Sequence, residues 1–289
     1  MSKYIVTTDS GCDLPMEYCL EREIYPISMT YSLNGKSLND TMDPNDMRAF
    51  YDGMRAGDAP KTSQVTPYQY TEFWKPLLKQ GLPIIHIALG TGISGTCANG
   101  ITAAEMLKAE YPEADIRVVD STLASVGYGI MAIMAADMRD EEKSADECEA
   151  RLNEIKGHIN TCYTTGDLTY LYRSGRVSKT GMVIAHALNI WPILKLDLEG
   201  HLIVESKERG KRNTINRIYD IISERCENPG EQTLFICHSD IPDEAHSFGE
   251  EIKEKFGFKD VFYTYIGTTI GTNCGPGLMA AFFIGKTRQ

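Results

Sequence analysis

A segment rich in glycine and hydroxyl groups, Gly-Thr-Gly-Ile-Ser-Gly-Thr at residues 90–96, offers the clearest chemistry in this sequence. It follows a short apolar run, 82–89, and precedes a helix-like segment, 97–111. Unpaired backbone N–H groups at the start of a helix, together with the helix dipole, favour a negatively charged ligand. The sequence therefore predicts an anion site here, with Ser94 and Thr96 as additional hydrogen-bond donors.

The same segment also reads G-x-G-x-x-G, which suggests a different ligand. A nucleotide-dependent enzyme would use Gly90–Gly95 for a pyrophosphate and Asp120, at the end of the next strand, for a ribose. Two features oppose this alternative. The segment is not in the first βαβ unit, and Ser94 leads into Thr96 where a closely packed helix start is expected.

Catalysis by a nucleophile or a metal has less support. The sequence around Ser94 lacks the last glycine of G-x-S-x-G, and no histidine stands out as its base. His86 lies inside an apolar run and is predicted to be a core residue. Histidines, cysteines and carboxylates show no metal-ligand spacing, so no catalytic residue and no metal site are expected.

Two further segments carry similar polar groups. Residues 61–67 place Thr62 and Ser63 ahead of a helix start, and the glycine-rich segment 267–277 adds Asn273. Three such segments, without a base or a metal, indicate a binding pocket rather than a reaction centre. Basic residues at 173–176 and 207–212 suit either a phosphate or acidic protein surface, or simply a solvated helix end.

Composition limits the remaining classes of function. The 289 residues carry a net charge of −11, which opposes general affinity for nucleic acid or anionic membranes. Eight scattered cysteines suggest reduced, buried thiols. The sequence start lacks the apolar core of a signal peptide, and no run reaches membrane-spanning length. A cytoplasmic protein without a membrane span is expected.

Strand-like and helix-like patterns alternate along the chain, which predicts an α/β fold with at least one partly parallel sheet. In the first part, strands are expected at 4–7, 24–33, 83–89 and 115–119, a turn at Asn34-Gly35, and helices after a capping Asp13 and at 44–56, 67–80, 97–111 and 123–138. In the second part, helices are expected at 145–158, 168–190 (broken near 174–175), 211–227 and 243–256, and strands at 162–165, 191–198, 201–207, 233–237 and 260–266, with Glu199-Gly200 as a two-residue hairpin turn.

The ordered set of these motifs resembles the DegV family of bacterial fatty-acid-binding proteins. The matching segments cover nearly the whole chain and are Thr8-Asp9-Ser10 with Asp13-Leu14-Pro15, Lys61-Thr62-Ser63-Gln64, Ser94-Gly95-Thr96, Val119-Asp120-Ser121, Arg173-Ser174-Gly175-Arg176 and Gly271-Thr272-Asn273-Cys274-Gly275-Pro276-Gly277. No single motif is specific, but their order is.

The resemblance implies a two-domain fold: 1–158 as an α/β domain with a partly parallel sheet flanked by helices, and 159–289 as a second α/β domain containing the hairpin. It implies a long-chain fatty acid buried between them, no other cofactor, and a separate fatty acid kinase that makes acyl-phosphate for phospholipid synthesis. Implied carboxylate-binding residues are Thr62, Ser94 and Asn273, supported by Ser63, Gly95, Thr96 and Gly275, with Arg173, Arg176 and Arg209 as contacts to the head group or the kinase.

One residue departs from the family pattern. Many members have a histidine where this chain has Asn273, and an asparagine donates a hydrogen bond without carrying a charge. A fatty acid would gain about 0.8 kcal/mol for each CH₂ group that an apolar tunnel buries. Segments 130–134 and 182–193 are candidates for the tunnel lining.

Overall fold

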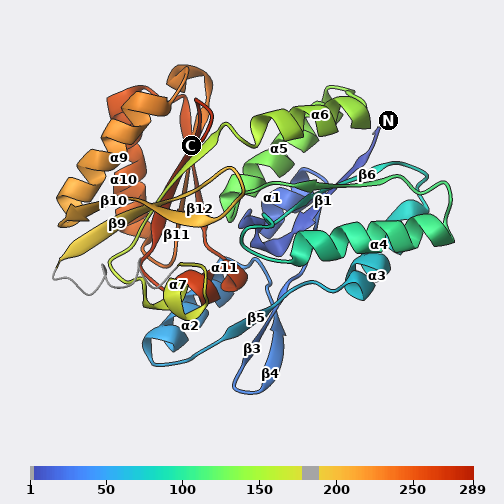
Figure 1. Ribbon diagram of the computed structural model, residues 1–289, viewed down its shortest axis with the longest axis horizontal. Coiled ribbons are helices and arrows are strands. Elements are labelled where there is room, and N and C mark those ends of the chain that lie inside the picture. Colours follow the sequence, from blue (N-terminus) through green and yellow to red (C-terminus); the bar gives the residue numbers. More distant parts are fainter. Residues whose placement is uncertain (1–2, 178–188) are drawn as a thin grey trace.

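The computed structural model describes residues 3–177 and 189–289 and contains two large β-sheets covered by helices (Figure 1). The first sheet is entirely parallel. In spatial order its strands are β2 (Ile24–Ile27), β1 (Ile5–Asp9), β6 (Ile84–Ala88) and β7 (Ile116–Asp120). Every residue of β1 and β6 is buried, as expected for central strands with helices on both faces.

Helices lie on both sides of this sheet, since parallel neighbours need a crossover connection. Figure 1 shows α5 and α6 on one side and α3 and α4 on the other. The helices of this part are α1 (Met16–Glu21), α3 (Pro67–Leu78), α4 (Thr96–Glu110), α5 (Val126–Asp140) and α6 (Ala145–Ile155), with a 3₁₀ turn at Ser10–Cys12.

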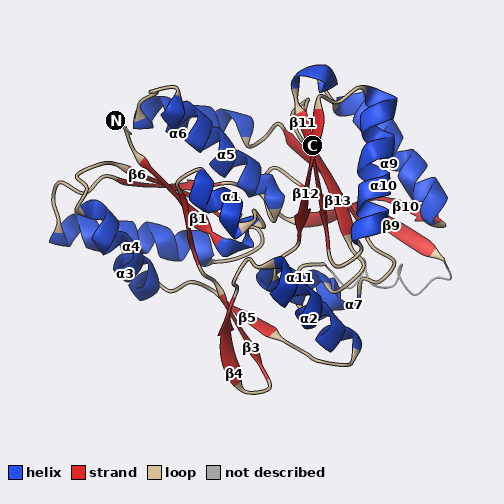
Figure 2. Cartoon of the chain, turned by 180° about the vertical axis from the view of Figure 1, so that it is seen from behind, coloured by secondary structure: helices blue, strands red, loops and turns tan. Residues whose placement is uncertain are grey.

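The second sheet has six strands and is antiparallel except for one parallel pair, β11–β12. In spatial order they are β10 (Leu202–Arg209), β9 (Ile190–Leu196), β8 (Ile159–Thr164), β13 (Met279–Ile284), β11 (Thr233–His238) and β12 (Asp260–Tyr265), with helices α9 (Lys211–Arg225) and α10 (Pro242–Phe256) and a 3₁₀ turn at Pro229–Glu231. Figure 2 shows α9 and α10 together beside this sheet.

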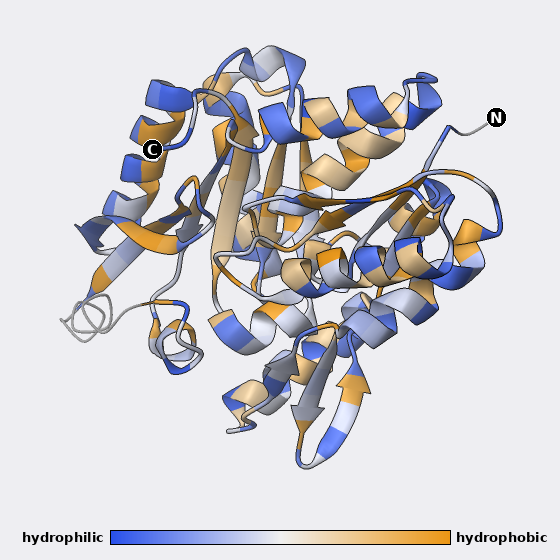
Figure 3. Cartoon of the chain, turned by 45° about the vertical axis from the view of Figure 1, so that its right-hand side comes forward, coloured by the Kyte–Doolittle hydropathy of each residue, from blue (hydrophilic) through white to orange (hydrophobic). Residues whose placement is uncertain are grey.

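Side chains on the two faces of β13 pack against different parts of the molecule. Ala281 and Phe283 pack in the cluster formed with α9 and α10. Ala280 and Phe282 point to the opposite face and belong to the large core that also contains β1, β6 and α5. The second sheet therefore lies between its own helices and the first half of the chain. In Figure 3 the strands carry much of the hydrophobic colour, whereas the helices also expose hydrophilic faces.

A small three-stranded arm projects from the body in Figure 1. Its strands are β4 (Lys36–Asn39), β3 (Thr30–Leu33) and β5 (Lys61–Ser63), and α2 (Pro44–Arg55) connects β4 to β5. Two short helices, α7 (Thr169–Arg173) and α11 (Thr268–Cys274), lie near this arm in both views (Figures 1 and 2). Since β5 contains Thr62, the arm carries one of the predicted binding residues.

Local signals placed several elements correctly. The Asp43 side chain accepts a hydrogen bond from the Asn45 backbone N–H at the start of α2. Thr66 and Gln69 form a capping box at α3. Asn34 and Gly35 both have positive φ and join β3 to β4, as predicted for this turn.

Several expectations were wrong. The single strand at 24–33 is two strands in different sheets, because the chain leaves β2 and enters the arm at β3. Asp13 does not cap α1, where Pro15 is the N-cap and no side chain contributes. The hairpin turn spans Asp197–His201 rather than two residues. The segment 267–277 is largely helix α11, not a loop. Helix 168–190 is reduced to α7 in the described residues, and 178–188 lie outside them.

The α/β class, with a parallel sheet flanked by helices and a second sheet, is confirmed. His86 is fully buried, as predicted. The eight cysteines form no disulfide in the part of the chain that the structure describes, and all but Cys226 are buried. None of the described helices combines the length and apolar character needed to cross a bilayer.

Candidate functional site

A cavity of about 180 Å³ lies between the two halves of the molecule. Apolar side chains make up most of its wall, and polar side chains line the rest. The apolar lining includes Met29, Leu89, Ile93, Leu171, Leu196, Leu202, Ile266, Ile270 and Leu278, and the polar lining includes Thr62, Ser63, Gln64, Ser94, Ser125, Arg176, Thr269 and Asn273. An apolar wall with a few convergent polar groups is typical of a small-molecule site, although such sites usually enclose about 300–1,000 Å³. The cavity is narrow for a long ligand.

Ser94 is oriented by its own helix start. Its Oγ lies 2.9 Å from the Thr96 Oγ1 and accepts a hydrogen bond of 3.3 Å from the Thr96 backbone N–H. Thr96 is fully buried, whereas Ser94 lines the cavity. The loop before it is anchored by Asp9, whose Oδ2 accepts a 2.9 Å hydrogen bond from the Leu89 N–H. Ser94 is thereby held at the cavity wall.

Thr62 approaches the cavity from the opposite element, strand β5. Its hydroxyl forms no hydrogen bond with the described residues, and the residue lines the cavity. Gln64, two residues later, accepts a hydrogen bond of 3.3 Å from Asn99 on α4, and Asn99 also donates to the Val65 carbonyl at 2.8 Å. These contacts tie the arm to the helix that follows Ser94. Gly95 lies against this side chain, because a Cβ there would be 2.9 Å from the Gln64 amide and would require that amide to shift.

Helix α11 supplies the third predicted residue. Asn273 lines the cavity, and its Nδ2 donates one hydrogen bond to the Thr269 carbonyl at 2.9 Å, so its second N–H is the donor left for a ligand. Gly275 ends the helix with φ of +73°, and a Cβ there would lie 2.1 Å from the Tyr170 ring. Gly275 thus acts by packing rather than by lining the cavity.

Arg176 is the cationic residue of the cavity lining. Its guanidinium donates to the Ser174 carbonyl at 2.5 Å and forms no ion pair with any described residue. Arg176 is partly buried, and this burial lowers the pKa of its guanidinium. A partly buried cation without a counter-ion favours an anionic ligand.

A second hollow, of about 450 Å³, adjoins the polar part of the first. Both are lined by Thr62, Arg176 and Asn273, and the second is also lined by Lys61 and Arg173. Arg209, by contrast, is an exposed residue at the end of β10 and lines neither hollow. The structure brings together every predicted carboxylate-binding residue and two of the three arginines.

The glycines of the G-x-G-x-x-G segment face the protein itself. A Cβ at Gly90 would lie 2.7 Å from the Leu123 backbone nitrogen, and one at Gly92 would lie 2.4 Å from the Gly200 carbonyl carbon. Asp120 accepts hydrogen bonds from the Thr91 N–H and hydroxyl and from the Thr122 N–H. The backbone where a pyrophosphate would lie and the carboxylate for a ribose are both engaged, which argues against the nucleotide alternative.

A buried polar centre beside the cavity was not predicted from the sequence. Ser125 has φ of +56° and ψ of −148°, a backbone conformation rare outside glycine. Its hydroxyl donates to the Asp13 carboxylate, whose Oδ1 accepts a 2.8 Å hydrogen bond from the Gly267 N–H. Burial raises the pKa of Asp13 well above its usual range, against the lowering effect of these two hydrogen bonds. Because Ser125 lines the cavity and Gly267 precedes α11, this centre connects elements from both halves of the chain.

Other expectations about the site have mixed outcomes. The lining segment proposed at 130–134 does not reach the cavity, and most of 182–193 lies outside the described residues.

The hairpin turn brings together the side chains of Asp197, Glu199 and His201, with possible metal-ligand atoms within 4.8 Å of one another. The spacing of these residues in the sequence did not suggest this cluster. His201 and Glu199 are exposed, and exposed groups of this kind are common without a metal.

Comparison with known proteins places the chain in a family. The model for the DegV family of uncharacterised proteins matches residues 3–286. A DegV domain-containing protein of Clostridium perfringens is 34% identical, with both chains covered completely. The crystal structure of DegV from Bacillus subtilis, described as a fatty acid binding protein, is 25% identical, covers 99% of this chain and all of its own, and has a TM-score of 0.84. A stearic acid-binding protein of Eubacterium ventriosum has a TM-score of 0.87 at 21% identity, with 99% of each chain covered, and this likeness shows the fold. The chain belongs to the DegV family.

Proposed function

We propose that this protein binds one long-chain fatty acid in the cavity between its two halves, with the carboxylate at Thr62, Ser94 and Asn273. The observation that carries the proposal is the apolar wall interrupted by these three uncharged hydrogen-bonding side chains. Structural relatives in the family bind fatty acids, which supports the ligand class. Ser63, Gly95, Thr96 and Gly275 support the geometry of this head-group site.

The ligand chemistry suits the lining. An acyl chain gains about 0.8 kcal/mol for each CH₂ group buried, so the apolar wall supplies most of the affinity. A buried carboxylate needs hydrogen-bond donors, and the hydroxyls of Thr62 and Ser94 can provide them. Arg176 adds positive charge beside this group, and that charge favours the ionised acid over an alcohol or an ester.

We assign the protein a carrier role, with no catalytic residue of its own. A separate fatty acid kinase would phosphorylate the bound carboxylate, and the product would enter phospholipid synthesis. The second hollow supports this proposal, because it adjoins the head-group residues and carries Lys61 and Arg173. Arg173 would contact the kinase or its phosphate donor, and Arg209 is a weaker candidate for the same partner. In this proposal 1–158 and 159–289 form the two domains, divided just before β8.

The ligand class is tested by organic extraction of the purified protein and mass spectrometry. We expect a long-chain fatty acid at close to one equivalent. A protein that carries no lipid, does not bind palmitate and binds labelled NAD would instead support a nucleotide-dependent enzyme.

The head-group site is tested by the double variant T62A/S94A. Each hydrogen bond to a charged group contributes about 1.5–3 kcal/mol, so the loss of two should cost about 3–6 kcal/mol and lower palmitate affinity by about 100-fold or more. Isothermal titration calorimetry measures the change. A matched control is T102A/S247A, which removes two exposed hydroxyls that bond only to helix carbonyls. Unchanged affinity in T62A/S94A would reject the assignment of these residues, whatever the ligand.

A further inference from the structure

We infer that Arg288 is a positioning residue that holds the β9–β10 hairpin against the Gly90–Ser94 loop and thereby limits how fast a ligand passes in and out of the cavity. The inference rests on the proposed function, because it needs a ligand that occupies this cavity. Arg288 follows β13, and Figure 1 shows that end of the chain beside the second sheet.

The Arg288 side chain reaches three separate segments. Its Nη1 donates to the Asp197 carbonyl at 2.9 Å and to the Leu196 carbonyl at 3.3 Å, at the end of β9. Its Nη2 donates to the Thr122 hydroxyl at 2.7 Å, after β7, and to the Lys156 carbonyl at 3.0 Å, after α6. One side chain thus joins both halves of the molecule.

These contacts are not those of a surface ion pair. Arg288 is only 3% exposed, and its partners are backbone carbonyls and a hydroxyl rather than a carboxylate. Burial lowers the pKa of the guanidinium, and the hydrogen bonds replace part of its lost contact with water. Loss of this side chain would leave several carbonyl groups without their donor.

The segments that Arg288 joins meet at close backbone contacts, which we call the hairpin junction: Gly92, Thr122 and Gly200. A Cβ at Gly92 would lie 2.4 Å from Gly200, and a Cβ at Gly200 would lie 3.1 Å from the Thr122 Cα. The contacts leave no room for side chains between the loop and the hairpin turn. At the hairpin junction, three backbone segments are therefore in direct contact.

The hairpin junction adjoins the cavity wall. Leu196, whose carbonyl bonds to Arg288, lines the cavity, and so does Leu202 at the start of the paired strand. Across the junction, Ile93 and Ser94 line the same cavity. Separation of the hairpin from the loop would open the wall between these two pairs of residues. The cavity holds only about 180 Å³, and movement of this wall would supply the further room that a long acyl chain needs.

The variant R288Q tests this role through the rates of palmitate binding. If the ligand passes through the opened junction, both the association and the dissociation rate depend on how often it opens. We expect R288Q to raise both rates on the order of tenfold and to leave the dissociation constant within about threefold. Radiolabelled palmitate with a chase of unlabelled palmitate gives the dissociation rate. R288K keeps the charge but fewer hydrogen bonds, so its rates should be intermediate.

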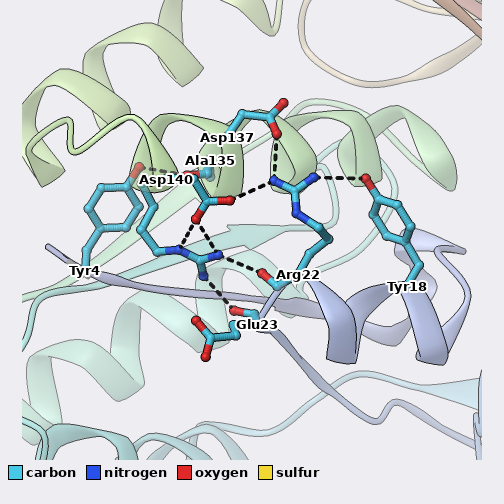
Figure 4. A network of polar contacts seen from close by, with 8 residues as sticks. Tyr4, Tyr18, Arg22, Glu23, Ala135, Asp137 and Asp140 are labelled. Carbon is cyan, nitrogen blue, oxygen red and sulfur yellow. Dashed lines mark hydrogen bonds and ion pairs between the residues drawn. The ribbon is translucent and has the colours of Figure 1, made fainter. Parts of the chain in front are cut away.

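Arg139 provides a matched control. It is 6% exposed, and it donates to the carbonyls of Glu23 at 2.9 Å and Arg22 at 2.8 Å. Figure 4 shows these partners within a polar network that also includes Tyr4 and Asp140, and none of them lines the cavity. R139Q should lower stability in the same way as R288Q without changing either palmitate rate.

Several outcomes would overturn the inference. Rates within twofold of the wild type in R288Q, a rise in the dissociation rate alone, or an equal effect in R139Q would each exclude a role at the junction. If R288Q does not fold, the variant G200A tests the same contact. It adds a Cβ at a residue with φ of +83°, 3.1 Å from the Thr122 Cα. Unchanged palmitate rates in G200A would also reject the inference. Failure of wild-type protein to bind palmitate would instead reject the proposed function.

Discussion

Asp13 joins the two halves of the molecule through a single carboxylate. It accepts from the Ser125 hydroxyl and the Gly267 N–H, and it lies close to Asp40, whose Oδ1 is buried without a hydrogen-bond partner among the described residues. Cys237 and Cys274 are neutral thiols nearby. Among the described residues no cation pairs with these carboxylates, and burial raises the pKa of Asp13, which favours its protonated form in the folded state.

Substitution D13N should therefore change how stability depends on pH. The pKa of Asp13 is raised in the folded protein, so between the unfolded value of about 3.9 and the folded value the native state holds one more proton. Stability from this group is present below the unfolded pKa and falls as pH rises, by at most about 1.4 kcal/mol per pH unit. D13N cannot ionise and should lack this decline.

Urea unfolding between pH 4 and pH 8 measures the effect. The exposed Asp220 on α9 gives a control, D220N, whose pH profile should remain parallel to that of the wild type. Parallel profiles for D13N and the wild type would show that Asp13 is ionised in the fold.

At the scale of the element, helix starts and one turn were predicted most accurately from the sequence. Asp43, Thr66 and Asn34 act through bonds or backbone angles within a few residues, so their patterns are visible in the sequence. The strands β4 and β5 were not predicted, because they are short and form only by pairing with β3. Their stability comes from tertiary contacts that no local pattern reports.

Helix α11 illustrates why a glycine-rich segment was misread as a loop. Glycine has low helix propensity, but Gly271 faces Tyr51, and a Cβ there would lie 2.3 Å from the Tyr51 hydroxyl oxygen. Tyr51 is fully buried and donates to the Ile266 carbonyl at 2.8 Å. The glycine is thus explained by a contact 220 positions away in the sequence, between residues 51 and 271. Asn273 and Ser94 were predicted as site residues by resemblance and motif, whereas Ser125 and Asp13 could not be, since their roles arise only from that kind of long-range packing.

The variant G271A should destabilise the protein, although glycine-to-alanine changes in helices usually stabilise. Overpacking against Tyr51 costs about 1–3 kcal/mol, which exceeds the gain of about 1 kcal/mol in helix propensity. Displacement of α11 should also weaken palmitate binding through Asn273. A double-mutant cycle with Y51F measures the contact, because removal of the hydroxyl takes away the shortest contact of the new methyl group and leaves the ring Cζ, at 2.8 Å, as the next one. Additive effects of G271A and Y51F would contradict this account.

At the scale of the whole molecule, one core continues through both halves. The cluster that contains Tyr4 and Ile85 of the first half also contains Leu194 and Phe282 of the second sheet. Tyr163 on β8 packs edge-to-face on Phe282, with ring centroids 5.4 Å apart, and its hydroxyl reaches toward the Ala124 carbonyl at 3.4 Å. Separation of the halves would expose this core to water, which couples their stability.

The two tryptophans allow that coupling to be measured. Trp74 is fully buried on α3, and Trp191 lies on β9, so each reports on one half. We unfold the variants W74F and W191F in urea and follow each one by tryptophan fluorescence and by circular dichroism. For each variant, we expect the two signals to change at the same urea concentration. A ligand held between the halves should shift both, and palmitate at 100 times its dissociation constant should stabilise by about 2.7 kcal/mol. Two separate transitions would mean that the shared core does not make the halves one cooperative unit. If only one of them responded to palmitate, the ligand would contact one half alone.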